Sequence, residues 1–118
     1  MGNTLRVTMK CLLAAGVVLV AALPEFAMAD MAPRSVTIKT FQFQPAQLEI
    51  AAGTPVTWTN TDEIEHIVAS GTPEHRTPMF KTSLKGPGTA FSVTFSKPGT
   101  YAYFCDRHQF MQGQITVK

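Results

Sequence analysis

The chain has 118 residues, of which 45% are hydrophobic and 15% are charged, and its formal net charge is +2. These values fit one ordinary globular domain and exclude a disordered polymer, a collagen-like repeat and a large multidomain enzyme. The near-neutral balance gives no electrostatic reason to expect a nucleic-acid partner.

The N-terminal segment has the pattern of a secretory signal peptide. Two basic residues precede an apolar run over residues 11–23, and a small-residue pattern at 27–29 follows it. The run, about 13 residues, is shorter than the ~20 that a membrane span needs. We therefore expect residues 1–29 to be removed, leaving residues 30–118 as one exported domain with a net charge of about +1 and no membrane span. An uncleaved N-terminal anchor is the alternative, and it exports the same domain.

The cysteine content restricts the chemistry of that domain. Of the two cysteines, Cys11 lies in the signal segment and Cys105 in the domain, so an intrachain disulfide is excluded. A lone cysteine in an oxidising compartment is buried, paired between chains, or protected by a bound metal.

From Val36 onward, polar and apolar residues alternate with the period of two that strands require, and no stretch has helical spacing. The segment 71–88 contains three prolines and three glycines, so we expect it to be a long connection. An all-β sandwich of about seven to eight short strands follows from this pattern. The expected strand regions are Val36 to Phe43 with Phe41 included, Leu48 to Ile50, Val56 to Asn60, His66 to Ser70, Phe91 to Phe95, Tyr101 to Cys105, and Ile115 to Val117.

One short segment carries three soft or borderline metal donors. Cys105, His108 and Met111 follow an aromatic strand at C-x2-H-x2-M spacing. His66 begins another predicted strand after a polar stretch, and two such strand ends meet at one pole of a sandwich. Two imidazoles, one thiolate and a weak thioether form the ligand set of a mononuclear blue-copper site. The sequence therefore predicts one copper ion at these four residues.

Other interpretations of the same residues are less favoured. A structural zinc site needs four firm Cys or His ligands, and a catalytic zinc needs a water position beside a general base. Taken singly, a cysteine such as Cys105 is most often a small buried hydrophobic residue. A histidine is most often a surface or capping residue, and a methionine such as Met111 fills space in the core. His75 and Met79 form a conceivable auxiliary copper pair, but a solvated loop is the expectation for that segment.

The wider pattern resembles the cupredoxins of the plastocyanin type. The two-residue gap between His108 and Met111, and the residues around it, resemble amicyanin. This resemblance implies a Greek-key sandwich or barrel with His66, Cys105, His108 and Met111 as copper ligands. The residues that carry it are Phe41, Phe43, Pro45, Leu48, Ile50, Gly53, Val56, Trp58, Asn60, His66, Phe91, Val93, Phe95, Pro98, Gly99, Thr100, Tyr101, Tyr103, Cys105, His108, Gln109, Phe110, Met111, Gln112 and Gly113.

Two substitutions depart from that family pattern. Ile67 stands where amicyanins and plastocyanins usually have an Asn whose amide steadies the ligand loops, and Gln109 stands where amicyanins usually have Pro. The amicyanin N-terminal extension is also mostly missing. The chain is therefore classed as amicyanin-like, and a role in methylamine oxidation stays open.

These observations predict a periplasmic electron carrier that cycles Cu(II)/Cu(I) and is no enzyme, since the chain has 3 histidines and no further His-rich site. We expect it to be a monomer that docks a c-type cytochrome or a periplasmic dehydrogenase near His108 and Phe110. The alternative for Phe110 is that it packs into the sandwich. A copper-delivery protein of metal homeostasis and a β-sandwich interaction module with an incidental Cys and His are the alternative functions.

Overall fold

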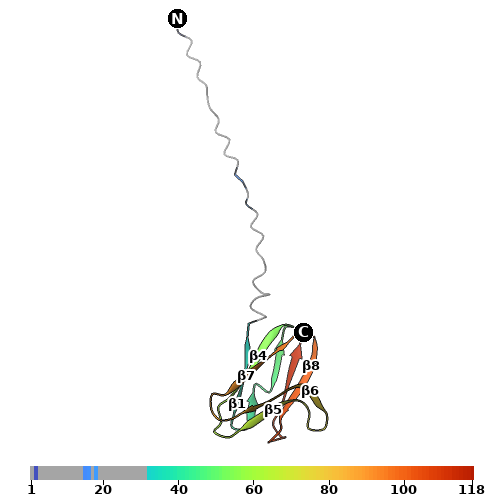
Figure 1. Cartoon of the computed structure of the whole chain (residues 1–118). Coiled ribbons are helices and arrows are strands. Elements are labelled where there is room, and N and C mark those ends of the chain that lie inside the picture. Colours follow the sequence, from blue (N-terminus) through green and yellow to red (C-terminus); the bar gives the residue numbers. More distant parts are fainter. Residues whose placement is uncertain (1, 3–14, 17, 19–31) are drawn as a thin grey trace.

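The computed structural model describes residues 32–118 together with residues 2, 15, 16 and 18. Apart from positions 2, 15, 16 and 18, the predicted signal segment 1–29 lies outside the described residues. Within this part of the chain, no helix is long and apolar enough to cross a membrane. The described strands form two sheets (Figure 1). Their bounds are β1 Arg34–Lys39, β2 Gln42–Gln44, β3 Gln47–Ile50, β4 Thr54–Asn60, β5 His66–Gly71, β6 Arg76–Leu84, β7 Ala90–Phe95, β8 Gly99–Cys105 and β9 Gln112–Val117.

The two sheets form a sandwich whose strand order mixes near and distant parts of the chain. One sheet has four strands in the order β2-β1-β4-β7, and the other has five in the order β3-β9-β8-β5-β6. The pairs β1 with β4 and β3 with β9 are parallel, and the other pairs are antiparallel. The chain changes sheets repeatedly, as in Greek-key folds. The predicted all-β sandwich is confirmed, with two separate sheets and no closed barrel over the described residues.

An aromatic cluster joins the sheets at the centre of the core. Trp58 on β4 is fully buried, stacks on Phe91 of β7 at 5.0 Å between ring centroids, and meets Tyr103 of β8 edge-on at 5.2 Å. Removing a buried ring of this size typically costs about 3–5 kcal/mol. The cluster therefore fixes how the sheets lie on each other, and with them the strand ends that meet at each pole.

The prediction of a long connection over residues 71–88 is wrong, because β6 (Arg76–Leu84) occupies its centre. This strand lies at the edge of the five-stranded sheet, beside β5. Pro78 falls where the register of β5 and β6 shifts, between the partners of Ala69 and Gly71. Proline is tolerated at edges and irregularities of a sheet, since no ladder hydrogen bond is then lost.

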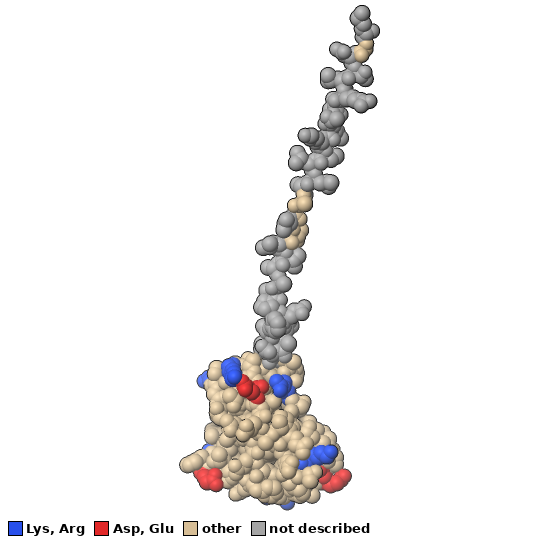
Figure 2. Space-filling view, turned by 180° about the vertical axis from the view of Figure 1, so that it is seen from behind, with Lys and Arg blue, Asp and Glu red and all other residues tan. Residues whose placement is uncertain are grey.

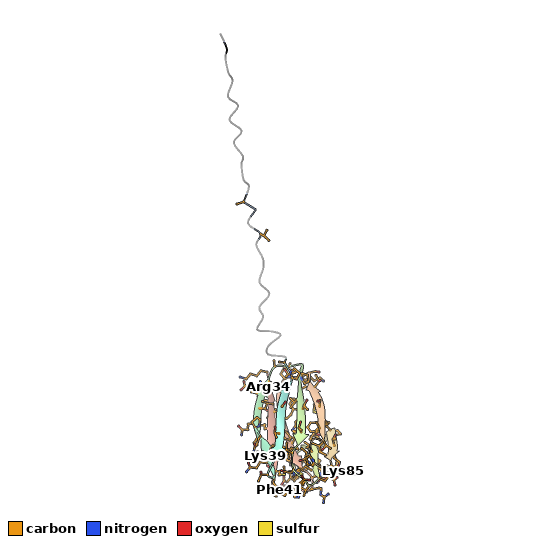
Figure 3. All side chains as sticks on the ribbon, turned by 90° about the vertical axis from the view of Figure 1, so that its left-hand side faces the viewer. Arg34, Lys39, Phe41 and Lys85 are labelled. Carbon is orange, nitrogen blue, oxygen red and sulfur yellow. The ribbon has the colours of Figure 1, made fainter. Side chains whose placement is uncertain are left out.

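The prediction that Phe41 belongs to a strand is also wrong. Lys39 pairs with Gln42, so Thr40 and Phe41 form a two-residue turn between β1 and β2, with φ values of 53° and 58°. The turn places Phe41 at the end of the sandwich opposite Arg34 (Figure 3).

Candidate metal centre

The pairing of β5 with β8 brings two predicted ligands to one end of the five-stranded sheet. His66 is the first residue of β5 and Cys105 the last residue of β8, and Val68 pairs with Cys105 in the antiparallel register. Both side chains are 0% exposed. The expectation that two strand ends meet at one pole is therefore confirmed for this pair.

Three donor atoms converge at this pole. The Cys105 sulfur lies 3.7 Å from Nδ1 of His66 and 3.7 Å from Nδ1 of His108. All three donors lie within 4.8 Å of one another, and in the described part of the chain they form the one such group of three His, Cys, Asp or Glu side chains. Two imidazole nitrogens and one sulfur thus face a common point.

Met111 completes the short segment that carries the other donors. Its side chain is 2% exposed. Its backbone N–H donates to the His108 carbonyl at 2.8 Å, and its carbonyl accepts from the Cys105 N–H at 3.0 Å. These bonds fold residues 105–111 back on themselves and bring the Met111 backbone next to Cys105 and His108.

The donor set fits copper. A mixed set of two imidazoles and one cysteine sulfur is typical of blue-copper sites, whereas structural zinc usually takes four firm Cys or His ligands. A sequence model described as "Copper binding proteins, plastocyanin/azurin family" matches residues 31–118. The chain belongs to this cupredoxin family. Its cofactor is copper.

Similar proteins and structures agree with this assignment. The chain is 38% identical over 89 residues to amicyanin-alpha of Methylorubrum extorquens, covering 70% of each chain. A purple cupredoxin from Nitrosopumilus maritimus matches with a TM-score of 0.65 and 28% identity, over 72% of this chain and 99% of that one. A copper-containing nitrite reductase from Thermus scotoductus matches with a TM-score of 0.63 and 33% identity, over 73% of this chain and 22% of that one. The last match concerns about a fifth of the reductase.

The first histidine of this cupredoxin is fixed from the side away from the donor group. His66 Nε2 donates to Asp62 Oδ2 at 2.9 Å, which leaves Nδ1 facing the Cys105 sulfur. Carboxylate partners of this kind set the tautomer and orientation of a ligating imidazole. Partial burial opposes ionisation of Asp62, but the backbone N–H groups of Phe41 and Thr40 and the His66 ring hold the pKa of that carboxyl below its usual value.

The second histidine lies nearer the surface. His108 is partly buried, and Phe41 meets its ring edge-on at 5.1 Å while Phe110 lies 6.3 Å away. Burial, followed by the nearby His66 and Arg107, lowers the pKa of His108 below its ordinary value. The ring therefore favours the neutral form, which is the form that binds metals.

Ion pairs hold the residue after Cys105 to the edge strand. Asp106 accepts from Arg76 at 2.7 Å and from Lys81 at 2.8 Å, and both partners come from β6. Arg76 and then Lys81 lower the pKa of Asp106 to about 2. The Arg76 guanidinium also lies over the Phe104 ring, 5.1 Å from its centroid.

A second contact joins the two ligand-bearing segments. Arg107 pairs with Glu65 at 2.7 Å, and Ser83 donates to the same carboxylate at 2.5 Å. The Asp106 N–H donates to the Ile67 carbonyl at 2.8 Å. Although Ile67 has no side-chain donor, backbone and ion-pair contacts thus connect the residues on either side of His66 to the loop after Cys105.

The conceivable auxiliary pair lies apart from this centre. His75 and Met79 line the same surface pocket, together with Ser70 and Tyr101. Both side chains are exposed, and no group of three His, Cys, Asp or Glu donors forms around them among the described residues.

Sequence reasoning missed the residues that hold the ligands in place. The sequence marks Asn60 as a strand residue of the family pattern, and Asp62 falls in the polar stretch before His66. Neither position predicts a contact, yet both side chains organise the segment before His66. The available signal was their type, because Asn and Asp before a ligand form local turns by accepting backbone N–H bonds. The Asp62 N–H does donate to Asn60 Oδ1, at 2.8 Å.

Proposed function

We propose that this cupredoxin is a one-electron carrier whose copper ligands are His66 Nδ1, Cys105 Sγ and His108 Nδ1, with Met111 as a weak axial ligand. The convergence of three donors at one buried pole carries this proposal. Bound copper supplies the Cu(II)/Cu(I) couple. The mixed donor set suits both oxidation states, because imidazole nitrogen binds Cu(II) and soft sulfur binds Cu(I).

The protein's part is to keep the donors in place during electron exchange. His66 is immobilised through Asp62, and backbone bonds close the loop from Cys105 to Met111. Side chains held in this way rearrange little, and small rearrangement favours rapid transfer. The proposed set supplies four protein ligands, whereas catalytic metal sites keep an open position for water or substrate, so we propose a carrier and not an enzyme.

The exposed apolar side chains around His108 form the proposed contact surface for redox partners. Phe110 is 73% exposed and Phe41 is 39% exposed, and their rings lie 6.3 Å and 5.1 Å from the His108 ring. Exposed apolar patches of this kind mark interaction sites. Figure 2 shows charged side chains of both signs on one side of the sandwich, and Arg107, next to His108, is paired with Glu65 at 2.7 Å. We therefore expect association to depend weakly on ionic strength.

We further propose that residues 1–29 direct export and that the domain over residues 30–118 works in the periplasm as a monomer. A c-type cytochrome or a periplasmic dehydrogenase is the proposed partner. Mass spectrometry of the protein recovered from a periplasmic fraction tests this, with Asp30 as the expected first residue. A mature chain that keeps residues 1–29 would contradict the proposed cleavage.

The test of the electron carrier is an optical spectrum of the copper-loaded domain. We expect an intense visible charge-transfer band that disappears on reduction and is lost in Cys105→Ser, because the thiolate supplies that band. His75→Ala is the matched control, since His75 lies outside the centre, and it should keep the band. An intense band surviving in Cys105→Ser would contradict the ligand set, and loss of copper to a chelator on reduction would favour copper delivery.

A further inference from the structure

The turn between β1 and β2 is unusual for its residues. Thr40 and Phe41 both have positive φ, at 53° and 58°, in a two-residue hairpin turn. Such turns usually carry Asn, Asp or Gly, because a Cβ in the left-handed region costs roughly 1–2 kcal/mol per residue. A bulky residue stays in this region only where its surroundings hold it there, and such sites are often functional.

Asp62 supplies the contacts that hold this turn. Its Oδ1 accepts from the Thr40 N–H at 2.8 Å, and its Oδ2 accepts from the Phe41 N–H at 3.1 Å. The same Oδ2 accepts from His66 Nε2 at 2.9 Å. One carboxylate therefore fixes both the strained turn and the orientation of a metal-facing imidazole, and bonds to a charged acceptor are stronger than neutral ones.

The turn carries the Phe41 ring to the metal pole. The ring meets His66 edge-on, with centroids 5.6 Å apart and planes at 83°, and meets His108 edge-on at 5.1 Å and 88°. It also lies 6.5 Å from the ring of Phe110. Phe41 projects at the end of the sandwich in Figure 3 and is 39% exposed, so it stands between solvent and both imidazoles.

We propose that Asp62 and Phe41 act together as a positioning unit for the copper centre. Asp62 orients His66 and pins the 40–41 turn, and Phe41, held in this way, covers the two imidazoles against small external ligands. This inference rests on the ligand set proposed above. It assigns the strained turn a function that strand formation alone does not require, since a glycine would close the same hairpin without strain.

Two variants separate the two halves of this unit. Asp62→Ala removes the acceptor for the turn and for His66, so the turn and the cover should both be lost. Phe41→Gly removes the cover but suits the left-handed backbone, so the turn should remain. Glu63→Gln is the control for loss of a neighbouring carboxylate, and Met79→Ala is the control for loss of an exposed apolar side chain away from the metal pole.

The first measurement is amide hydrogen exchange of Thr40 and Phe41 in the metal-free domain. Asp62→Ala should lower their protection about tenfold, because a hydrogen bond to a charged group is lost at each, whereas Phe41→Gly and Glu63→Gln should keep protection at Thr40. Unchanged exchange in Asp62→Ala would overturn the pinning of the turn. This readout needs no copper, so it stands apart from the electron-carrier proposal.

The second measurement is azide binding to the Cu(II)-loaded domain, followed by the visible spectrum. Asp62→Ala and Phe41→Gly should bind azide at least about tenfold more tightly than the wild type, while Met79→Ala and Glu63→Gln should not. Asp62→Ala should also bind copper about 10–100-fold more weakly, as expected when the partner of a ligating histidine is removed. Wild-type azide binding in Phe41→Gly would overturn the cover, whereas absent electron exchange with normal copper binding would contradict only the carrier function.

Discussion

The segments that precede His66 and follow Cys105 meet at the same pole but are held there by different means. The first is fixed by buried side chains. Asn60 is 0% exposed, and its amide donates to the carbonyls of Ile64 and Leu84 while its Oδ1 accepts from Asp62. His66 at the end of this segment is fully buried.

The second segment is closed by its own backbone and tied down at its surface. The Cys105 N–H and the Met111 N–H make the bonds that close it, and the side chains of Asp106 and Arg107 form ion pairs on the outside. It leaves Phe110 73% exposed. For the proposed carrier, we expect the first segment to anchor the centre and the second to contact redox partners.

If the first segment anchors the centre, loss of the Asn60 amide should lower the stability of the domain more than the other changes considered below. Asn60→Ala leaves two carbonyls and one N–H without their partner, and each unsatisfied buried group costs about 1–3 kcal/mol. We expect the free energy of unfolding of the metal-free domain to fall by about 3 kcal/mol, measured by urea denaturation.

Thr57→Ala is the control for that experiment. Thr57 lies on the same strand, but its hydroxyl bonds to Ser92 at an exposed position, so its loss should cost well under 1 kcal/mol. A similar loss of stability in both variants would show that the anchor is no more important than the outer face of β4.

Within the second segment, Met111 should tune the centre without forming it. A long axial thioether adds little to copper binding but affects the reduction potential. Met111→Gln should therefore keep copper and lower the potential by about 60 mV or more, the value of a tenfold change for a one-electron couple. Voltammetry of the copper-loaded domain measures this. Complete loss of copper at micromolar protein would mean that Met111 is a full ligand.

If the second segment contacts redox partners, a change at Phe110 should alter the rate of electron transfer. Phe110→Glu should lower the bimolecular rate of electron transfer with a soluble c-type cytochrome about fivefold or more, because the added charge must lose water when an apolar contact forms. Copper content and potential should stay unchanged. Stopped-flow kinetics across a salt series measures the rate. Thr94→Glu, which adds the same charge on β7, is the control, and an equal rate in wild type and Phe110→Glu would place the contact surface elsewhere.

Much of this architecture was predictable from local patterns. Period-two alternation located most strands, and the spacing of Cys105 and His108 with the upstream His66 located three donors that the structure brings together. Their role as ligands, and that of Met111, stays a prediction. The alternation and the Cys-His spacing are local signals. The match with His66 depends only on two strand ends meeting at one pole, which a sandwich fold allows.

The errors arose where tertiary contacts override local preference. Pro78 and the neighbouring glycines indicated a loop, but at the edge of a sheet a proline costs no ladder bond, so β6 forms there. Phe41 fitted a strand pattern, but the carboxylate of Asp62, distant in sequence, holds it in a left-handed turn. Neither the edge position of Pro78 nor the Asp62 contact of Phe41 can be inferred from the residues adjacent to it in the sequence.

The smallest expected effect concerns the outer ion pairs of the second segment and depends on pH. Arg76 and Lys81 lower the pKa of Asp106 from 3.8 to about 2, so Asp106 binds protons more weakly in the folded than in the unfolded domain. Its contribution to stability is therefore complete above about pH 4 and is lost as the pH falls through about 2. Because Arg76 is 47% and Lys81 59% exposed, solvent screening reduces this contribution to about 1 kcal/mol.

Asp106→Asn should thus lower the free energy of unfolding of the metal-free domain by about 1 kcal/mol at neutral pH, with the two proteins converging as the pH approaches 2. Urea denaturation between pH 2 and 7 measures the difference. Glu49→Gln is the matched control, because it removes an exposed ion pair with Lys118 at a site where the Glu49 and Lys118 side chains are 57% and 71% exposed. A difference for Asp106→Asn that persists at the lowest pH would assign its effect to packing, and the second segment would then be held by its backbone alone.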